Sequence, residues 1–353
     1  MGHFVVRRVL SGFALILALT IVTFAISTAI PSSLDPACLV VDCQTATKAE
    51  INAARHQLGV DRPFYVQYAH FVWRLVRHAS FGNSFQGTPI DYTLKTTLPA
   101  TASIVLGGVL LLLLLAIPLG LISALRAHTA TDRVVLLVSV FGIALHPLVV
   151  GFLLRRIFHN WLDLAPSAAY CPLRGHTSIT PGVVPGASYL PKAGVVPYTC
   201  GGFADWSSHL ALPWLTFAIF FLPMYTRIIR TRVLETLDEP HVATARAKGA
   251  SEGRVLRRHV LRIALLPLIS MVAMDIGGAL MAAIYIEVSF GFNGIGHLVL
   301  NLLESDQTSF GFDLPLIVGV FFVIGLAIVV LNLVADVLHY LLEPRVRLRG
   351  ASA

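Results

Sequence analysis

The sequence predicts an all-α integral membrane protein with six transmembrane helices and both termini in the cytoplasm. Its composition, the spacing of its apolar runs and the distribution of its charges predict this class. Hydrophobic residues make up 56% of the 353 residues and charged residues 13%, about half of the roughly 25% charge of ordinary soluble domains. Most of the chain is therefore expected to face lipid rather than water.

Six segments have the roughly 20 predominantly apolar residues that a helix needs to cross the hydrocarbon core of a bilayer. The first is preceded by Arg7 and Arg8, but its apolar run of 22 residues exceeds the roughly 7 to 15 of a cleaved signal core, so an uncleaved anchor is expected. The glycine pairs at 107–108 and 277–278 leave bare patches where helices can pack closely or bend. The expected spans are residues 9–30, 100–125, 134–154, 210–229, 263–287 and 314–337.

Lysine and arginine predict the orientation of these spans, because basic loops resist translocation across the membrane. With the N-terminus inside, the inner segments hold 16 basic residues in 65 positions, and the outer segments hold 10 in 148. Both ends are therefore expected in the cytoplasm. The net charge of +7 follows this membrane pattern, so no nucleic-acid partner is expected.

Two outer segments carry all four cysteines, Cys38, Cys43, Cys171 and Cys200, on the side where thiols can oxidise. Residues 31–98 show helical patterning at 48–58 and 66–76 and are expected to form an ordered subdomain. The centre of residues 158–208 is expected to be a loop. Four cysteines allow three pairings; sharing of a loop favours Cys38 with Cys43 and Cys171 with Cys200, and four free thiols are the alternative.

A basic segment rich in small residues lies between the fourth and fifth predicted spans. It is expected to form two short helices, since Pro240 suits a first helical position, Gly249 a left-handed stop and Ser251 a cap for the second helix. Only alanine, threonine and valine stand between the charges of the first helix, so another protein could approach its backbone closely. A basic amphipathic helix lying on lipid headgroups is the alternative. The stripe of the second helix is expected to comprise Leu256, Val260 and Ile263.

Ionisable groups inside spans are candidates for a translocation pathway, because they cost about 2.5 to 3.5 kcal/mol to insert and tend to face a cavity. Asp275 is the ionisable residue nearest the middle of a predicted span, the one at 263–287, and Glu287 lies at the end of the same span. A structural hydrogen bond is the alternative for each. His146, beside Pro147, is expected to satisfy backbone groups that the proline releases.

Three separated stretches resemble one known family, the inner-membrane permease subunits of binding-protein-dependent ABC importers, in the branch that takes up dipeptides, oligopeptides and nickel. Thr-Ala-Arg-Ala-Lys-Gly at 244–249, with Arg258, His259 and residues 261–262 and 264–267, resembles the family's cytoplasmic coupling motif. Residues 58–63, 81–85 and 98–101 resemble its first outer segment. Glu287, Gly294 and Gly296 with residues 332–336 and 343–347 resemble its closing pattern.

The resemblance implies a type I importer permease, whose domain is expected at residues 99–345. An anchor at 1–30, an outer subdomain at 31–98 and a tail at 346–353 complete the chain, with an outer loop at 158–208 and a coupling loop at 230–262. The resemblance also implies that Arg246 and Lys248 pair with acidic groups of an ATPase while Ala243, Ala245 and Ala247 pack into its cleft. The expected docking residues are Glu239, His241, Val242, Ala243, Thr244, Ala245, Arg246, Ala247, Lys248 and Gly249.

The expected partners are a second permease, two ATPase subunits, an extracytoplasmic binding protein and the plasma membrane. Since no phosphate-cradling glycine-lysine loop occurs in the sequence, ATP and magnesium are expected on the partners, and no catalytic, cofactor or metal residue is expected here. Peptides are the expected substrate, with nickel or another small solute as the alternative. An ion-coupled secondary transporter is a further alternative; an intramembrane hydrolase would need a nucleophile and base within the spans, and no such set occurs there.

Overall fold

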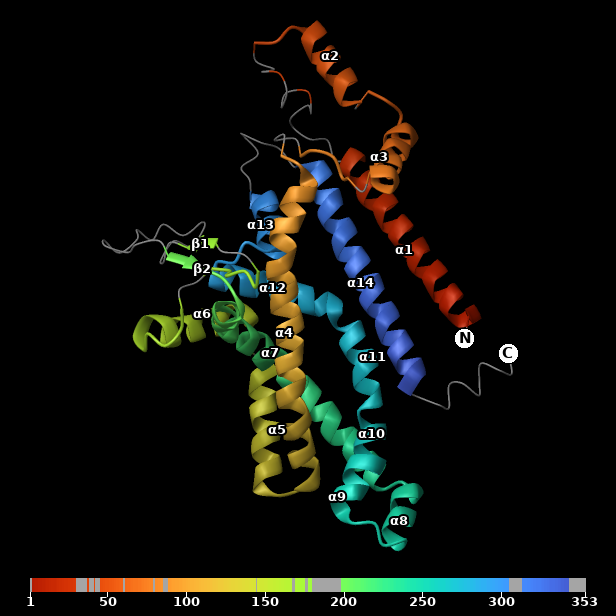
Figure 1. Ribbon diagram of the computed structural model, residues 1–353, viewed down its shortest axis with the longest axis vertical. Coiled ribbons are helices and arrows are strands. Elements are labelled where there is room, and N and C mark those ends of the chain that lie inside the picture. Colours follow the sequence, from red (N-terminus) through yellow and green to blue (C-terminus); the bar gives the residue numbers. More distant parts are fainter. Residues whose placement is uncertain are drawn as a thin grey trace. The chain divides into compact units, whose positions relative to one another are not determined.

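A computed structural model describes residues 2–29, 37, 41, 45–59, 61–78, 80–84, 88–143, 145–166, 169–174, 177–179, 198–304 and 313–342. The chain divides into two units, Met1–Pro99 with His297–Leu333, and Ala100–Gly296 with Val334–Ala353. Figure 1 shows the elements coloured along the sequence. They are α1 (Gly2–Ala29), α2 (Lys48–Leu58), α3 (Phe64–His78), α4 (Ile90–Leu125), α5 (Ala130–Ile143), α6 (Pro147–Arg155), η2 (Arg156–Trp161), β1 (Thr177–Ile179), β2 (Tyr198–Cys200), α7 (Phe203–Leu237), α8 (Pro240–Ala247), α9 (Glu252–Arg254), η3 (Val255–Val260), α10 (Leu261–Ala264), α11 (Leu266–Met274), α12 (Ile276–Phe290), α13 (Ile295–Glu304) and α14 (Leu314–Leu342).

Among the described residues, three helices are long and apolar enough to cross a membrane: Ile90–Leu125, Phe203–Leu237 and Pro315–Val337. The segments Glu252–Met274 and Gly277–Phe290 meet the same test as a pair that is bent by 62°. Helix α1 runs unbroken over 28 residues, with an apolar stretch at Val9–Val22. The helical membrane architecture is confirmed, while the number of six spans stays a prediction.

The expected span at 134–154 is not one continuous helix, since α5 ends at Ile143 and α6 begins at Pro147. His146 has extended backbone angles (φ −75°, ψ 138°), as the residue before a proline prefers. Its Nδ1 accepts a hydrogen bond from the Leu148 amide at 3.3 Å, so His146 caps α6. The expectation that His146 satisfies backbone groups at this proline is confirmed.

The expected span at 263–287 is likewise broken rather than one continuous helix. Helix α11 ends at Met274, α12 begins at Ile276, and Asp275 lies at the junction with backbone angles of −80° and 0°. Both halves are strongly apolar, so the break does not mark the end of an apolar run. Asp275 therefore occupies a bend rather than the middle of a continuous helix.

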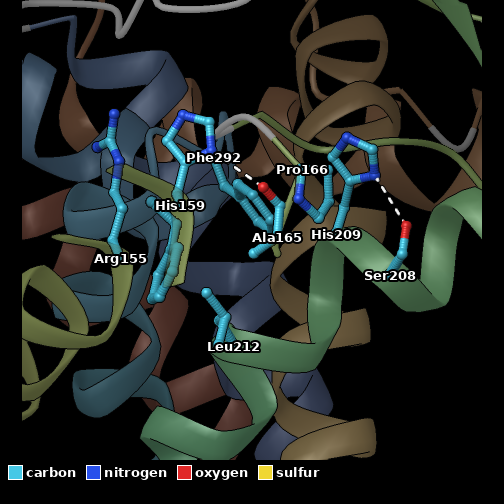
Figure 2. A pocket seen from close by; sticks show the side chains of 9 residues that line it. Arg155, His159, Ala165, Pro166, Ser208, His209, Leu212 and Phe292 are labelled. Carbon is cyan, nitrogen blue, oxygen red and sulfur yellow. Dashed lines mark hydrogen bonds between the residues drawn. The ribbon is translucent and has the colours of Figure 1, made fainter. Parts of the chain in front are cut away.

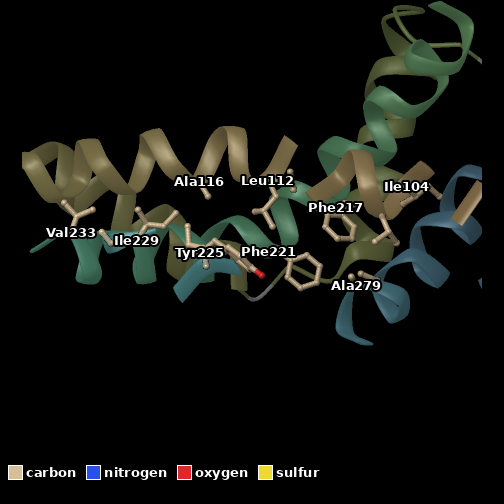
Figure 3. Packing of buried hydrophobic residues seen from close by; sticks show 14 of the residues in the cluster. Ile104, Leu112, Ala116, Phe217, Phe221, Tyr225, Ile229, Val233 and Ala279 are labelled. Carbon is tan, nitrogen blue, oxygen red and sulfur yellow. The ribbon is translucent and has the colours of Figure 1, made fainter. Parts of the chain in front are cut away.

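The core of the second unit is built where glycines on α4 meet large side chains on α7. A Cβ added to Gly107 would overlap Trp214, and one added to Gly108 would lie 2.6 Å from Cγ of Phe217. Further along, Gly120 lies against Ile229. Figure 3 shows the aromatic side chains of Phe217, Phe221 and Tyr225 in this cluster. The close packing expected at 107–108 is confirmed, whereas an added Cβ at 277 or 278 meets no described atom within 4 Å.

Replacing Gly108 by alanine is expected to destabilise the protein by about 1 to 3 kcal/mol, because the added methyl overpacks the core. Thermal unfolding in detergent measures this. Gly278→Ala is the matched control and is expected to be neutral, since its Cβ enters open space. Equal unfolding temperatures for the two variants would contradict the packing of α4 on α7.

Beside the helices, the outer segment at 158–208 contains a short antiparallel pair of strands, β1 with β2, while its centre at 180–197, the expected loop, lies outside the described residues. Thr177 pairs with Cys200, and Ile179 with Tyr198. Cys200 is disulfide-bonded to Cys171 with a Cα–Cα distance of 5.9 Å, so this predicted pair is confirmed. The other predicted pair, Cys38 with Cys43, lies outside the described residues.

The first unit contains the two helices expected in the outer segment, α2 and α3. Helix α2 begins at a capping box, in which the Glu50 amide donates to the Thr47 hydroxyl and the Thr47 amide donates to the Glu50 carboxylate. Helix α3 packs on α1, where Phe24 meets Phe64 and Tyr68 edge to face. The predicted helical patterning at 48–58 and 66–76 is therefore confirmed.

Candidate functional site

The basic segment forms a hairpin of short helices that begins with α8. Glu239 stands at its N-cap in an extended conformation and Pro240 at the first helical position. Gly249 ends the turn with φ +80°, and its amide donates to the Arg246 carbonyl at 2.9 Å. Because few residues other than glycine adopt this backbone angle without strain, the predicted start and stop of this helix are confirmed.

One face of α8 packs on its own chain. Val242 is 0% exposed and Ala245 9%, and both join a core that includes Val255 and Val260. The expectation that Ala245 packs into a partner's cleft is therefore wrong, because its methyl group is already buried. The exposed residues of the helix are Pro240, Ala243, Thr244, Arg246 and Ala247, and Lys248 at its C-cap is exposed as well.

The second helix keeps Val260 and, partly buried, Leu256 of the predicted stripe on the core, but it departs from the stripe at Ile263 because it widens into the π-helical segment η3. Bonds of the i→i+5 type shift the buried positions, which fall at Val255, Val260 and Ala264, while Ile263 is 36% exposed. The carbonyl of Ser251, not its side chain, accepts from the Arg254 amide at 2.8 Å and opens α9. Ser251 therefore occupies the predicted N-cap position, but its side chain makes no capping hydrogen bond.

An exposed bidentate ion pair closes the hairpin of α8 and α9. Arg246 donates from Nε to Glu252 Oε1 at 2.9 Å and from Nη2 to Oε2 at 3.2 Å. His241 Nδ1 lies 2.9 Å from Glu239 Oε2. The sequence analysis missed Glu252, although an acidic residue placed just after the glycine turn is a signal for such a closure. The pair holds the Arg246 side chain in a defined position at the surface.

The two pathway candidates lie in different surroundings. Asp275 is half-buried at the bend and accepts a hydrogen bond from the Tyr225 hydroxyl at 2.8 Å. Glu287 is 0% exposed, and its Oε1 accepts from the Thr101 hydroxyl at 2.5 Å. Thr101 in turn accepts from the Ile295 amide at 2.8 Å. A Cβ at Gly294 would overlap the Glu287 carboxylate, so the two glycines at 294 and 296 make room for it.

A small pocket lies beside the last turn of α6, where Figure 2 shows the rings of His159 and His209. His159 Nδ1 donates to the Ala165 carbonyl at 3.0 Å, and His209 Nδ1 donates to the Asp205 carbonyl at 2.8 Å. Arg155 donates to the Ser289 carbonyl at 3.0 Å. Backbone oxygens thereby fix the three polar side chains, and Phe292 closes the apolar side.

The sequence matches two family models over most of its length. Residues 116–348 match the model of the binding-protein-dependent transport system inner membrane component. Residues 1–105 match the model of the N-terminal part of such membrane components. The first match alone covers more than half of the chain.

Curated relatives align from end to end. The chain is 31% identical to a protein of Escherichia coli named "Probable D,D-dipeptide transport system permease protein DdpB", over 97% of both chains. It is 28% identical to the oligopeptide transport system permease protein AppB of Bacillus subtilis, over 98% of this chain and 99% of the relative. It is 27% identical to the di/tripeptide transport system permease protein DppB of Pseudomonas aeruginosa, with the same coverage.

The apolar helices, the glycine-terminated basic hairpin and the matched models agree from one end of the chain to the other. The chain therefore belongs to the family of binding-protein-dependent transport system inner membrane components, as a multi-pass permease subunit of the ABC importer class.

Proposed function

We propose that this chain is one of two permease subunits that together form a translocation pathway for dipeptides or oligopeptides. An extracytoplasmic binding protein delivers the peptide, and two cytoplasmic ATPase subunits, which hold ATP and magnesium, drive transport. The names of the relatives, which refer to dipeptides, tripeptides and oligopeptides, support the substrate class. This chain itself carries out no bond chemistry and needs no cofactor.

The geometry of α8 is the observation that carries this proposal. It presents Ala243, Ala247 and Lys248 on one exposed face, while Val242 and Ala245 fasten the opposite face to the body of the chain. A partner that grips the exposed face therefore moves a packed element rather than a loose loop. Such rigid-body displacement is how closure of two ATPases can rock membrane helices between inward-open and outward-open states.

The proposal places α8 in the cytoplasm, with six spans and both termini inside. The anchor occupies residues 1–30, the outer subdomain 31–98, the permease domain 99–345 and the tail 346–353. Asp275 is the proposed pathway residue, because the bend leaves it half-buried beside two bare glycines. Glu287 has a supporting role in the same proposal, since it holds the segment after α12 through Thr101.

Reconstitution tests the function directly. The complex is purified through a tag on this chain and placed in vesicles with its binding protein, and uptake of radiolabelled trialanine is measured with and without ATP. Uptake that needs ATP and is unaffected by dissipating the proton gradient supports the proposal. Uptake driven by the proton gradient alone points to a secondary transporter, and ATP-driven uptake of Ni²⁺ but not trialanine replaces the substrate class.

Reversing both charges of the exposed face, Arg246→Glu with Lys248→Glu, is expected to abolish trialanine uptake and co-purification of the ATPase subunits. The reversal places like charges beside Glu252 and removes two cations from the docking face. Membrane insertion is expected to be unchanged. Pull-down from detergent and vesicle uptake measure the two effects.

Two variants serve as controls. Glu252→Gln breaks the intramolecular pair and leaves both cations in place, so it is expected to retain docking. The reversal Arg126→Glu with Arg133→Glu changes the same number of exposed charges, one in the turn before α5 and one in the first turn of α5, and is also expected to dock. Loss of docking in this second control would attribute the effect to net charge rather than to α8.

A further inference from the structure

An ion pair joins α5 to α7 near the end of α7 that leads into α8. Arg230 donates from Nε to Asp132 Oδ1 at 2.6 Å and from Nη2 to Oδ2 at 2.7 Å. The side chains are 17% and 3% exposed. Both nitrogens of one edge of the guanidinium face both oxygens of the carboxylate, which is the geometry that gives Arg–carboxylate pairs their directional strength. The two residues are 98 positions apart in the sequence.

The same carboxylate also fastens the end of α4 and the turn that follows it. The Ser123 hydroxyl donates to Asp132 Oδ1 at 2.6 Å, and the His128 amide donates to Oδ2 at 2.9 Å. Each oxygen thus accepts two hydrogen bonds, which fills the acceptor capacity of a carboxylate. The hydrogen bonds from Arg230, and then those from Ser123 and His128, outweigh burial and hold the pKa of Asp132 well below its usual range. Asp132 is therefore ionised at neutral pH.

Arg230 is connected stiffly to α8. It lies seven residues before Leu237, and only Asp238 and Glu239 separate α7 from α8. Val233 on α7, Val242 on α8 and Val255 on η3 are buried in one core. A displacement of α8 must therefore carry the end of α7, and Arg230 with it.

Helix α5 meets α7 in a second place, where Gly142 lies against Pro223. This contact is apolar and lies at the far end of α5 from the ion pair. The ion pair thus attaches the hairpin of α4 and α5 to the part of α7 that leads into α8. Buried ion pairs are weak contributors to net stability, because desolvation offsets much of their attraction, so stability alone is a poor explanation for a carboxylate with four donors.

We propose that Asp132 and Arg230 are positioning residues that transmit the motion of α8 to the hairpin of α4 and α5 during transport. This inference rests on the proposed function. It requires that the pair act after docking, so that its loss separates ATP hydrolysis from uptake without detaching the ATPases. A purely structural role would instead lower both activities together.

The test measures trialanine taken up per ATP hydrolysed by the reconstituted complex. Asp132→Asn keeps the side-chain volume and removes the charge, and Arg230→Lys keeps the charge and removes the bidentate geometry. Each is expected to lower the ratio by about tenfold, which is typical of coupling between sites. Arg232→Gln is the matched control, since Arg232 lies on the same helix in an exposed pair with Glu235, and its ratio is expected to stay within about twofold of wild type.

A covalent link between positions 132 and 230 can replace the ion pair, which keeps the test decisive where a single variant folds poorly. The double variant Asp132→Cys with Arg230→Cys is expected to hydrolyse ATP with little uptake, and a short bifunctional thiosulfonate that bridges the two cysteines is expected to restore uptake. Each single cysteine variant, treated alike, is expected not to recover.

The outcomes separate this inference from the function on which it rests. If Asp132→Asn takes up trialanine at the wild-type rate and with the wild-type ratio of uptake to ATP hydrolysis, the inference alone is overturned. The inference is also overturned if uptake and hydrolysis fall in proportion and the thiosulfonate bridge between the two cysteines does not restore uptake. A wild-type complex that takes up trialanine without any need for ATP overturns the proposed function and the inference with it.

Discussion

Replacing Gly249 by proline is expected to reduce ATP-driven uptake to background while the chain still inserts into the membrane. Gly249 has φ +80°, whereas proline is held near −65°, and the substitution also removes the amide that donates to the Arg246 carbonyl at 2.9 Å. The turn between α8 and α9 then cannot close as it does here. Uptake of trialanine and protease mapping of membrane vesicles measure the two parts of this expectation.

Two substitutions separate backbone geometry from the mere loss of glycine. Gly249→Asn is expected to retain most uptake, because asparagine tolerates left-handed backbone angles better than other residues with a side chain. Gly253→Ala is expected to be neutral, since Gly253 lies in α9 with open space around its Cβ. Normal transport by the proline variant would show that the turn has no part in coupling.

Replacing Thr101 by valine is expected to destabilise the protein by about 3 kcal/mol or more, because one hydroxyl serves two buried groups. It donates to Glu287 and accepts from the Ile295 amide, so its loss removes a hydrogen bond from each of two buried groups, at about 1 to 3 kcal/mol each and more where the group is charged. Valine has nearly the shape of threonine, so packing changes little. The midpoint of thermal unfolding in detergent gives the effect.

The chain offers close controls for this substitution. Thr101→Ser retains the hydroxyl and is expected to retain most of the stability. Thr97→Val, one turn earlier on α4, removes a hydroxyl that donates at 2.9 Å to the Thr93 carbonyl of its own helix, so a smaller loss is expected. If Thr97→Val and Thr101→Val unfold at the same temperature, the hydroxyl of Thr101 does not hold Glu287 in the way described.

Local stereochemistry explains which features of the hairpin could be predicted. Pro240 and Gly249 each restrict their own backbone, so the start and stop of α8 follow from single residues. The sequence does not predict that Ala245 faces the core of its own chain, because a helix of small residues has no clear difference between an apolar and a polar side. The exposure of Ile263 could not be predicted either. The predicted stripe assumes the 3.6 residues per turn of an α-helix, whereas η3 is π-helical and has a wider turn.

Composition predicts where the chain is apolar but not where it bends. The runs at 134–154 and 263–287 were long enough to cross a membrane, yet the chain breaks at His146 and at Asp275. Pro147 was a signal for the first break, and the glycine pair at 277–278, where a bend was one of two expectations, directly follows the second. The pairs of Asp132 with Arg230 and of Thr101 with Glu287 join residues 98 and 186 positions apart, and a single sequence carries no pattern that relates such distant positions.

The disulfide of Cys171 with Cys200 closes a loop whose ends are 29 positions apart in sequence and 5.9 Å apart in space. Lengthening a loop that is already closed adds little entropic cost. Insertions and deletions between these cysteines therefore leave the anchoring points on the permease in place. Over evolution, this segment can diversify its length and charge while the helices that it connects keep their packing.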